Sequence, residues 1–407
     1  MRVEKEMLEN KGDINVFIIG LRGYTQNYGG WEAFAHGLLD NWNDRSIHFF
    51  AFEKVDDYKK EEIIEVKGVT CIRVCEKETG SSVMMKYDKR CTDLTCEYVQ
   101  KFNIKNPIMF HLGVRIGPYL YMQRKKIHKL GILMMENPAG AEWRRTKWNR
   151  LVQIYLWISA IMMAKSTDCM ACDNEGIKKL YEKMLYGRKP LLEYVAYGVD
   201  STERVSDDMP LKVKEFFDKW HIERDNYYLI LGRFIPENNY EMMFKGFIQS
   251  KSKRKLLVIC NYQTEIPKFL KYIKKTTNYE LDKRIIMAGT LYDKDILHYV
   301  RQYAHGYIHG HSVGGTNPGL LEAMAETDVN ILYKVDFNRY VGGNCACYFS
   351  SENELADKIN RIDNISAELK IKKGIDARER METKYSWEHI VNEYKRIIKK
   401  MVENNEK

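Results

Sequence analysis

The sequence is poor in proline and has no long apolar run. Only 8 of its 407 residues are proline and 26 are glycine, too few for a collagen-like or low-complexity chain. No segment repeats with a period of roughly 20 to 50 residues, which excludes solenoids and propellers. The longest apolar run, residues 151–164, is interrupted by Gln153 and is shorter than the roughly 20 residues that span a bilayer. We therefore expect no transmembrane helix.

A signal peptide and a disulfide framework are also lacking. Residues 1–13 carry charges of both signs without an apolar stretch, so we expect a cytoplasmic protein. The nine cysteines have no regular spacing, as in proteins whose thiols stay reduced. Cys169 and Cys172 have the spacing of a redox or zinc pair, but a second pair with intervening histidines is missing. Ordinary buried cysteines are the favoured interpretation, and no metal is expected.

The composition indicates a folded protein with a mild basic excess. Hydrophobic residues make up 44% of the chain, and 65 Lys and Arg against 56 Asp and Glu give a net charge of +9. This apolar content excludes general disorder, and the length suggests two domains. The basic residues are expected to be spread through the chain instead of forming one stripe with stacking aromatics, which argues against nucleic-acid binding.

One basic and aromatic cluster stands out. Residues 143–150 (WRRTKWNR) precede the apolar run 151–164, and such a cluster can rest on anionic lipid headgroups. The alternative is a buried interior helix with a solvated first turn, because a helix that is apolar on all sides is usually core.

Short β-rich runs alternate with helical ones in both halves of the chain, which predicts parallel sheets covered by helices. The polar, turn-forming segment 200–210 separates the two series. Each series contains a glycine loop after a strand, where backbone amides at a helix start attract phosphate. Predicted strands cover residues 14–20, 47–52, 69–74, 108–112, 131–135, 168–171 and 192–195 in the first series, and 227–232, 255–260, 284–288, 306–309 and 329–333 in the second; predicted helices cover 32–41, 239–251, 294–303, 320–326 and 387–402.

The first glycine loop does not follow the dinucleotide pattern G-x-G-x-x-G. An acidic residue, Glu53, follows the second strand, but its spacing from the glycines is too loose for that fingerprint. A nicotinamide dehydrogenase is therefore disfavoured.

Several motifs resemble glycosyltransferase family 4, and more narrowly its rhamnosyltransferase-like branch, which assembles capsule and other bacterial surface polysaccharides. The resemblance spans nearly the whole chain. It implies the GT-B fold, in which two Rossmann-like α/β domains face a central cleft and the last helix crosses back to the first domain. It also implies a retaining transfer from a nucleotide sugar without a cofactor or a required metal. The motifs are residues 29–32 (GGWE), 194–198 (YVAYG), 232–239 (GRFIPENN), 309–318 (HGHSVGGTNP), 321–325 (LEAMA) and 385–388 (YSWE).

The resemblance implies domain limits of 1–203 with 385–407 for the acceptor side and 204–384 for the donor side. It implies that Arg233 stabilises the diphosphate, that Glu322 binds the nucleotide ribose, and that His111 contacts a sugar. A fixed cation after a strand and glycines that let the backbone approach a phosphate suit these roles. The expected donor-binding residues are Gly29, Gly30, Asn238, Asn239, Leu291, Tyr292, Gly314, Gly315, Thr316 and Asn317.

On the acceptor side, Asn137, Glu142 and Trp143 resemble a motif in which an acidic residue follows the asparagine. The expected aspartate is Ala139, which puts acceptor choice in doubt. Two further positions depart from the wider family. Gly314 stands where many members have the first of two glutamates, and Asn239 stands where they have a lysine. Both substitutions fit the rhamnosyltransferase-like branch.

These observations predict a hexosyltransferase that moves rhamnose from dTDP-L-rhamnose, or a sugar from a UDP-sugar, onto a lipid-linked saccharide at the inner face of the cell membrane. The alternative is a subunit that binds the nucleotide sugar without catalysis and supports another transferase. A GT-B epimerase ranks last, since only histidines such as His111, His309 and His311 are candidate acids and bases.

Overall fold

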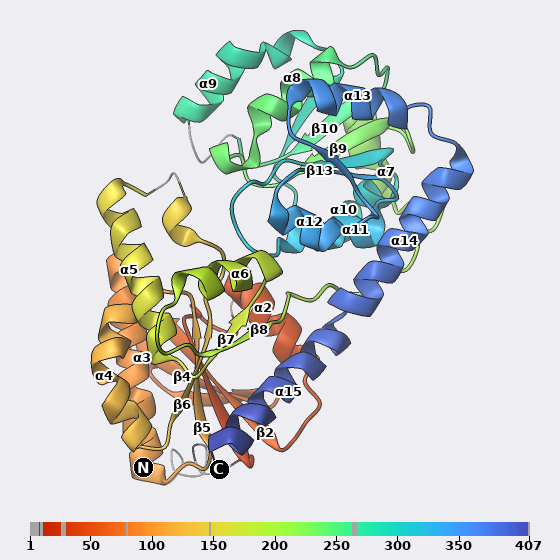
Figure 1. The fold of residues 1–407 in the computed structure, drawn as a ribbon. Coiled ribbons are helices and arrows are strands. Elements are labelled where there is room, and N and C mark those ends of the chain that lie inside the picture. The colour runs from red at the N-terminus through yellow and green to blue at the C-terminus, as the bar shows by residue number, and fades with distance from the viewer. Residues whose placement is uncertain are drawn as a thin grey trace. The chain divides into compact units, whose positions relative to one another are not determined.

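The computed structural model describes Leu8 and residues 11–25, 30–78, 80–145, 148–262 and 267–405. The chain divides into two compact α/β units (Figure 1). The first unit comprises Met1–Gly198 and Trp387–Lys407, and the second comprises Val199–Ser386. The polar segment 200–210 belongs to the second unit.

The first unit is built on an eight-stranded sheet in the order β3-β4-β2-β1-β5-β6-β7-β8. All neighbours are parallel except β3 and β4. Because helices cover a parallel sheet on both faces, its central strands are continuously apolar, and every residue of β1 and β5 is buried. The elements are β1 (Ile14–Ile19), α2 (Gly30–Asp40), β2 (Ile47–Val55), η1 (Tyr58–Lys60), β3 (Ile63–Val66), β4 (Val69–Cys75), α3 (Ser81–Phe102), β5 (Pro107–Leu112), α4 (Gly117–Lys129), β6 (Leu133–Asn137), η2 (Glu142–Arg144), α5 (Arg150–Ser166), β7 (Cys169–Cys172), α6 (Glu175–Met184), β8 (Leu191–Tyr194) and α15 (Trp387–Asn405).

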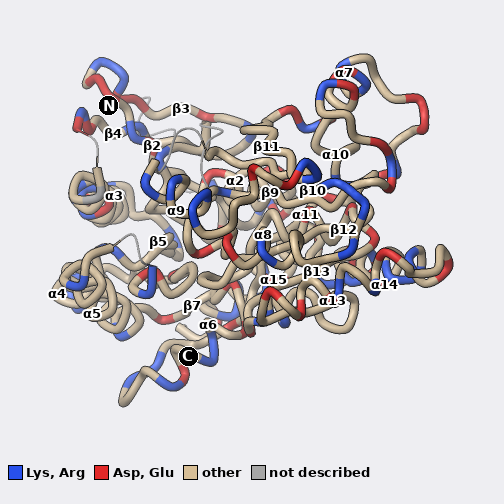
Figure 2. Tube along the Cα trace, turned by 90° about the horizontal axis from the view of Figure 1, so that it is seen from above, with Lys and Arg blue, Asp and Glu red and all other residues tan. Residues whose placement is uncertain are grey.

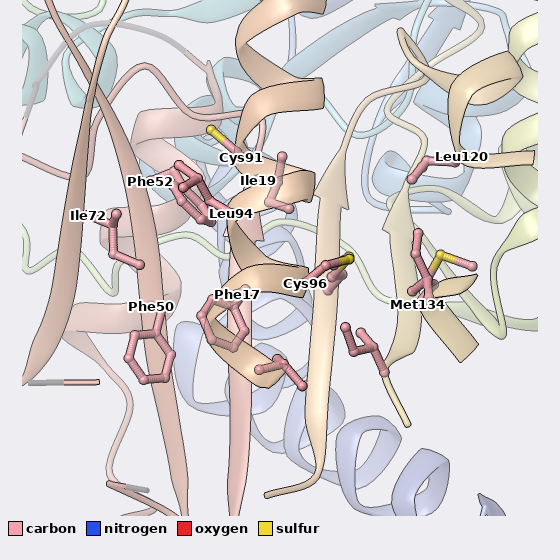
Figure 3. Packing of buried hydrophobic residues seen from close by; sticks show 14 of the residues in the cluster. Phe17, Ile19, Phe50, Phe52, Ile72, Cys91, Leu94, Cys96, Leu120 and Met134 are labelled. Atoms are coloured by element: carbon pink, nitrogen blue, oxygen red, sulfur yellow. The ribbon is translucent and has the colours of Figure 1, made fainter. Parts of the chain in front are cut away.

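One face of this sheet forms a core with α3 and α4 (Figure 3). Phe17 and Phe50 stack on neighbouring strands with ring centroids 4.4 Å apart, and Cys91 and Leu94 of α3 and Leu120 of α4 belong to the same cluster. The burial of these side chains holds the two helices on the sheet, since apolar area removed from water is the main stabilising contribution to folding.

The second unit is built on a six-stranded, fully parallel sheet in the order β11-β10-β9-β12-β13-β14. Its core gathers apolar residues of β9, β10, α8 and α13. The elements are α7 (Leu211–Trp220), β9 (Tyr227–Leu231), η3 (Pro236–Asn238), α8 (Tyr240–Gln249), β10 (Lys255–Ile259), α9 (Pro267–Thr277), η4 (Tyr279–Leu281), β11 (Ile285–Gly289), α10 (Lys294–Gln302), β12 (Gly306–His309), α11 (Pro318–Glu326), β13 (Asn330–Tyr333), α12 (Asp336–Gly342), β14 (Cys347–Phe349), α13 (Glu352–Ile362) and α14 (Ala367–Tyr385).

Both sheets contain a point where the strand order reverses. In the first, the chain runs outward from β1 to β2 and β4 and then returns to place β5 on the other side of β1. In the second, it runs from β9 to β10 and β11 and returns to place β12 beside β9. Ligands of open α/β sheets bind at the carboxyl ends of the strands at such a point. The loops after β1, β5, β9 and β12 are therefore the candidate site elements.

The last helix, α15, packs on the first unit. Trp387 lies against two glycines, Gly37 of α2 and Gly198; a Cβ on Gly37 would come within 1.8 Å of the Trp387 ring. Tyr394 of α15 lies between Phe34 and Phe110, with ring centroids 5.7 Å from each. The predicted return of the last helix to the first domain is confirmed.

The interpretation of residues 151–164 as a wholly buried helix is wrong. Leu156, Ser159, Ala160, Met163 and Ala164 of α5 face the protein, but four large apolar residues on its other side are exposed, namely Leu151, Ile154, Trp157 and Ile158. The helix packs on one side only. No helix in the described ranges combines the length and the apolar character that crossing a membrane requires.

Candidate functional site

In the second unit, two neighbouring asparagines join the loop after β9 to the loop after β12. Asn238 donates to the Arg233 carbonyl at 2.7 Å, and its side-chain oxygen lies 2.7 Å from His311 Nδ1. Asn239 adopts a left-handed conformation with φ of 51° and donates to the Gly310 carbonyl at 2.7 Å. Asparagine tolerates this conformation better than most residues. The two predicted donor-binding asparagines thus fix the loops that flank the reversal point.

Arg233 is the second residue beyond the end of β9, after Gly232. Its side chain is exposed, and among the described residues no carboxylate lies within 4 Å of its guanidinium. Its backbone is held by Asn238 and by a bond from the Ile235 amide to its carbonyl at 3.0 Å. The cation is therefore anchored at its base and available to an anionic ligand.

The glycine loop between β12 and α11 requires small residues at two positions. A Cβ on Gly310 would come within 2.2 Å of the Asn238 carbonyl oxygen, and Gly314 has φ of 153°, with His311 Nε2 at 2.9 Å from a Cβ. Thr316 is buried, while Gly315 is half-buried.

Asn317 caps helix α11, because its side chain accepts from the Leu320 amide at 3.3 Å. Helix α11 begins with Pro318, whose missing N–H is no loss at a helix start. The partial positive charge of this helix start favours an anion.

Glu322 is one of two carboxylates that a single buried arginine holds. Arg301 of α10 pairs with Glu322 and lies 3.4 Å from Glu326, and its side chain is only 7% exposed. Glu326 also lies 2.8 Å from His298 Nδ1. Burial raises the pKa of Glu326 against the opposing effect of Arg301. The ribose ligand that the sequence predicts, Glu322, is thus oriented by Arg301, which the sequence did not single out.

His309 ends strand β12 and is buried. Its Nδ1 lies 3.0 Å from the Tyr307 hydroxyl, and Nε2 has no hydrogen-bond partner in the described structure. Burial lowers the pKa of His309 to about 3, so the ring is neutral at pH 7.

The predicted base-framing segment follows β11. Gly289 has φ of 80°, which suits glycine. Leu291 is half-buried, and Tyr292 is 75% exposed. No hydrogen bond or ring contact holds Tyr292 among the described residues of the second unit, so its exposed ring is available to stack on a ligand.

In the first unit, His111 lies in β5 one residue before the strand ends. It is 2% exposed, and its Nε2 lies 3.2 Å from the Thr92 hydroxyl of α3. Its Nδ1 has no partner among the described residues. Burial lowers the pKa of His111 to about 3, so it is a neutral group at pH 7 and cannot act as a fixed cation.

Arg115, which the sequence interpretation missed, connects the ends of β1 and α3. It lies 2.9 Å from Asp88 Oδ2 and donates to the Gly20 carbonyl at 3.2 Å. Burial raises the pKa of Asp88 to about 6 despite the opposing charge of Arg115. Its position after a strand and a glycine, like that of Arg233, is the signal that could have identified it.

Two glutamates hold the loop after β1. Glu32 accepts from the Arg22 amide at 2.8 Å. Glu53 accepts from the Thr25 amide at 2.7 Å and lies 3.2 Å from Arg73. Glu53 therefore organises the loop, in keeping with the judgement that it does not complete a dinucleotide fingerprint. Of the two predicted glycines, Gly30 begins α2 and Gly29 lies outside the described residues.

The predicted acceptor-side residues make contacts with other residues of the first unit. Asn137 is fully buried; it accepts from the Ala139 amide at 2.9 Å and donates to the Tyr394 hydroxyl at 3.5 Å. Glu142 pairs with Arg145 at 2.8 Å, and the Trp143 ring packs edge-on against Tyr181, 6.2 Å between centroids. Ala139 has a left-handed φ of 56°.

A buried carboxyl that the sequence interpretation missed lies beside this group. Glu136 pairs in register with His111 in the sheet, and both of its carboxyl oxygens lack a hydrogen-bond partner among the described residues. Burial raises the pKa of Glu136 well above its ordinary value. Burial therefore favours the protonated form of this carboxyl. Nothing in its sequence context distinguishes it from an ordinary strand residue.

Two other features lie apart from these groups. Cys169 and Cys172 are fully buried in β7, and burial raises the pKa of both thiols. A cavity of about 390 Å³ lies between the segment 201–210 and α10. None of the predicted site residues lines it.

The second unit thus presents an exposed arginine, a glycine loop and a helix start at one reversal point, an arrangement suited to a phosphate-bearing ligand. The first unit presents two buried titratable groups, His111 and Glu136, at its own reversal point.

The chain was compared with known proteins. The family model of a domain of unknown function, DUF1972, matches residues 13–200. No curated protein matches the sequence.

Solved structures are similar over nearly the whole chain. Sucrose-phosphate synthase from Thermosynechococcus elongatus matches with a TM-score of 0.73 and 14% identity, covering 96% of this chain and all of the other. A glycosyltransferase from Rickettsia africae matches with 0.70 and 14%, covering 96% and 99%. Anabaena Alr3699/HepE in complex with UDP matches with 0.69 and 10%, covering 95% and 100%. The chain therefore has the GT-B fold of glycosyltransferases, with two Rossmann-like units, as predicted.

Proposed function

We propose that the protein is a retaining glycosyltransferase that moves a sugar from a nucleotide sugar to a saccharide acceptor. The observation that carries the proposal is the arrangement around Arg233: an exposed arginine, its backbone held by Asn238, follows β9, and the neighbouring strand β12 leads into the glycine loop and the start of α11. The likeness to a structure titled as a complex with UDP supports a nucleotide donor.

In this proposal the second unit binds the donor. Arg233 and the backbone amides of residues 314–316 meet the diphosphate and stabilise the charge that grows on it as the sugar leaves. Glu322, oriented by Arg301, accepts hydrogen bonds from the ribose.

The acceptor hydroxyl approaches from the side on which the diphosphate leaves, and a departing phosphate oxygen takes its proton. The bond from the anomeric carbon to the diphosphate breaks as the bond to the acceptor oxygen forms, so the anomeric configuration is retained. No protein base is required, which agrees with the pKa of about 3 to which burial lowers His111 and His309, since such histidines are weak bases. Positioning and charge stabilisation supply the catalysis.

The finer assignments belong to the same proposal. The motifs around Arg233 and Glu322 resemble those of family 4 and its rhamnosyltransferase-like branch, and this resemblance supports dTDP-L-rhamnose or a UDP-sugar as donor. The acceptor is a lipid-linked saccharide at the inner face of the cell membrane, and the product contributes to capsule or another surface polysaccharide. No metal or other cofactor takes part.

Thermal-shift measurements test the donor site. Purified protein is screened with dTDP-rhamnose, UDP-glucose, UDP-N-acetylglucosamine, UDP-galactose and GDP-mannose, because a ligand that binds the native state raises the melting temperature. We expect a rise with one donor that Arg233→Ala abolishes and Arg361→Ala, on the exposed side of α13, does not. In transfer assays with saturating donor, Arg233→Ala lowers turnover roughly 100-fold, the scale of losing one oxyanion donor. Wild-type turnover in that variant contradicts the assignment, and donor binding without transfer to any acceptor identifies a non-catalytic subunit.

A further inference from the structure

The net charge of the chain is concentrated in one segment. Residues 113–167 contain ten Lys and Arg and two Asp and Glu, a net charge of +8, whereas the whole chain carries +9. The basic residues themselves are spread through the chain, as expected, since only 10 of the 65 lie in this segment; its net charge is high because acidic residues are scarce there. This segment contains α4, β6, η2 and α5, all in the first unit.

The two acidic residues of this segment do not face solvent as free charges. Glu136 is fully buried and Glu142 pairs with Arg145. The exposed cations, by contrast, have no carboxylate within 4 Å among the described residues. They lie along α4 and around the start of α5, where Figure 2 shows Lys and Arg in blue, and they are Lys125, Lys126, Lys129, Arg144 and Arg150.

The same two helices expose large apolar side chains. On α5, Leu151 is 79% exposed, Ile154 54%, Trp157 46% and Ile158 42%. Leu151, Ile154 and Ile158 follow the spacing i, i+3, i+7, so they lie on one side of the helix. On α4, Met122 is 71% exposed.

The packing of the two helices explains this exposure. The first turn of α4 contacts the middle of α5, because the Gly117 amide donates to Ser159 Oγ at 2.9 Å. A Cβ on Gly117 would come within 1.9 Å of the Ser159 carbonyl oxygen. Both helices run between parallel strands and so point the same way. The first half of α5 therefore extends past the start of α4 (Figure 1). The segment after η2 contacts it there, with Gln153 donating to the Arg145 and Trp148 carbonyls at 3.1 Å, and Leu151, Ile154 and Ile158 remain exposed.

We infer that this face of α4 and α5 docks the protein on an anionic lipid surface. The apolar stripe enters the acyl boundary and the unpaired cations meet the headgroups. Trp157 has the amphipathic side chain that is favoured at the membrane–water interface. The link to a lipid-linked acceptor rests on the proposed function, but the docking surface does not.

Other occupants fit less well. A second copy of the same face would bring the five exposed, unpaired cations against their own copies, which opposes association. Nucleic acid would require rings on which bases stack, and the stripe on α5 is mainly aliphatic. An anionic bilayer matches both the apolar stripe and the cations.

Co-sedimentation of the full-length protein with vesicles tests the inference. The probes are vesicles of phosphatidylcholine with about 30% phosphatidylglycerol and vesicles of phosphatidylcholine alone. We expect binding to the anionic vesicles that weakens as salt is raised, and much weaker binding to the neutral ones.

The apolar stripe is tested by a triple variant in which exposed residues become glutamine, since this leaves the core untouched. We expect the partition coefficient to fall at least tenfold, because apolar area no longer leaves water. The substitutions are Leu151→Gln, Ile154→Gln and Ile158→Gln. A matched control changes three exposed apolar residues of the second unit and is expected to bind within twofold of wild type; its substitutions are Leu211→Gln, Leu281→Gln and Ile371→Gln.

The cations are tested by a second triple variant, Lys125→Gln, Lys126→Gln and Lys129→Gln. Each Lys or Arg near an anionic surface contributes roughly fivefold to binding, so we expect a loss of about 100-fold. Circular dichroism and the melting temperature verify that each variant is folded.

Several results would overturn the inference. These are absence of binding by the wild type, equal binding to neutral vesicles, wild-type binding by both first-unit variants, or loss in the control. A dimer in sedimentation velocity that dissociates in the apolar variant, without vesicle binding, would identify a second copy as the occupant. Donor-induced thermal shifts are measured in the same samples. If the wild-type protein does not bind vesicles but shows donor-induced shifts, docking alone is rejected. If the wild-type protein binds vesicles but shows no donor-induced shift, the proposed function alone is rejected.

Discussion

Replacement of Gly37 by alanine should destabilise the first unit, although alanine is the better helix former. In an exposed helix interior, Gly→Ala gains about 1 kcal/mol. At Gly37, however, the new Cβ would lie 1.8 Å from Trp387 Cζ2 and 2.2 Å from Cε2. Overpacking of this kind costs about 1–3 kcal/mol or more.

The Trp387 ring has little freedom to move away from the new methyl group. On its other side it lies against Gly198, where a Cβ would come within 2.3 Å of Trp387 Cδ2. We therefore expect the cost to fall in the upper part of that range. The net effect is a loss of about 1–2 kcal/mol, which lowers the melting temperature of the first unit by about 2–8 °C.

Urea and thermal unfolding, followed by fluorescence and calorimetry, measure this loss. Because the chain contains two units, the transitions are assigned separately, and only that of the first unit should shift. The decisive comparison is Gly37→Ala in a Trp387→Leu background. There the clash is removed and helix propensity remains, so the same substitution should stabilise by up to about 1 kcal/mol. Equal effects of Gly37→Ala in both backgrounds would refute the reasoning.

Two further predictions concern buried titratable groups. Arg301→Met should destabilise the second unit by about 3–5 kcal/mol, because Glu326 loses its buried partner. The double variant Arg301→Met with Glu326→Gln should recover most of this loss when urea unfolding is measured. Absence of recovery would contradict the pairing. The folded state lowers the pKa of His111 and of His309 to about 3, from 6.5, so stability is complete above about pH 6.5 and decreases as the pH falls toward 3. The quantity to measure is the change in the free energy of unfolding per pH unit between pH 7 and pH 5. His111→Gln should reduce this slope for the first unit by up to about 1.4 kcal/mol per pH unit. An unchanged slope would show that the histidine takes up its proton in the folded state over this range.

The sequence predicted the central strands well because their apolar runs are continuous. Strands β1 and β9 lie within one residue of their predicted limits. The edge strands β3 and β14 were missed, since each has at most four residues, half-buried or exposed for the most part. Helix α3 was also missed, because its polar residues hide the apolar face that packs on the sheet.

The site could be predicted only as a set of positions. The pattern of glycines and Arg233 predicts a site in the second unit at the carboxyl ends of β9 and β12, and these two strands are neighbours in the sheet. The sequence could not predict which of these side chains are engaged in hydrogen bonds within the protein. Asn239 is held by Gly310 and Asn137 by Tyr394, and these contacts join residues far apart in the sequence. The burial of Glu136 likewise depends on neighbours that only the tertiary structure brings together.

The return of α15 to the first unit affects how the protein is made. During synthesis, residues 1–198 emerge first, but the helix that covers α2 begins only at Trp387. At about 5–20 residues per second, the ribosome needs roughly 10–40 s to produce the remainder of the chain. Over that period Phe34, Phe110 and the glycine surface that receives Trp387 lack their partners. The second unit, contiguous in sequence, completes its fold before the first, so the nascent chain passes through a state with this apolar surface open to chaperones.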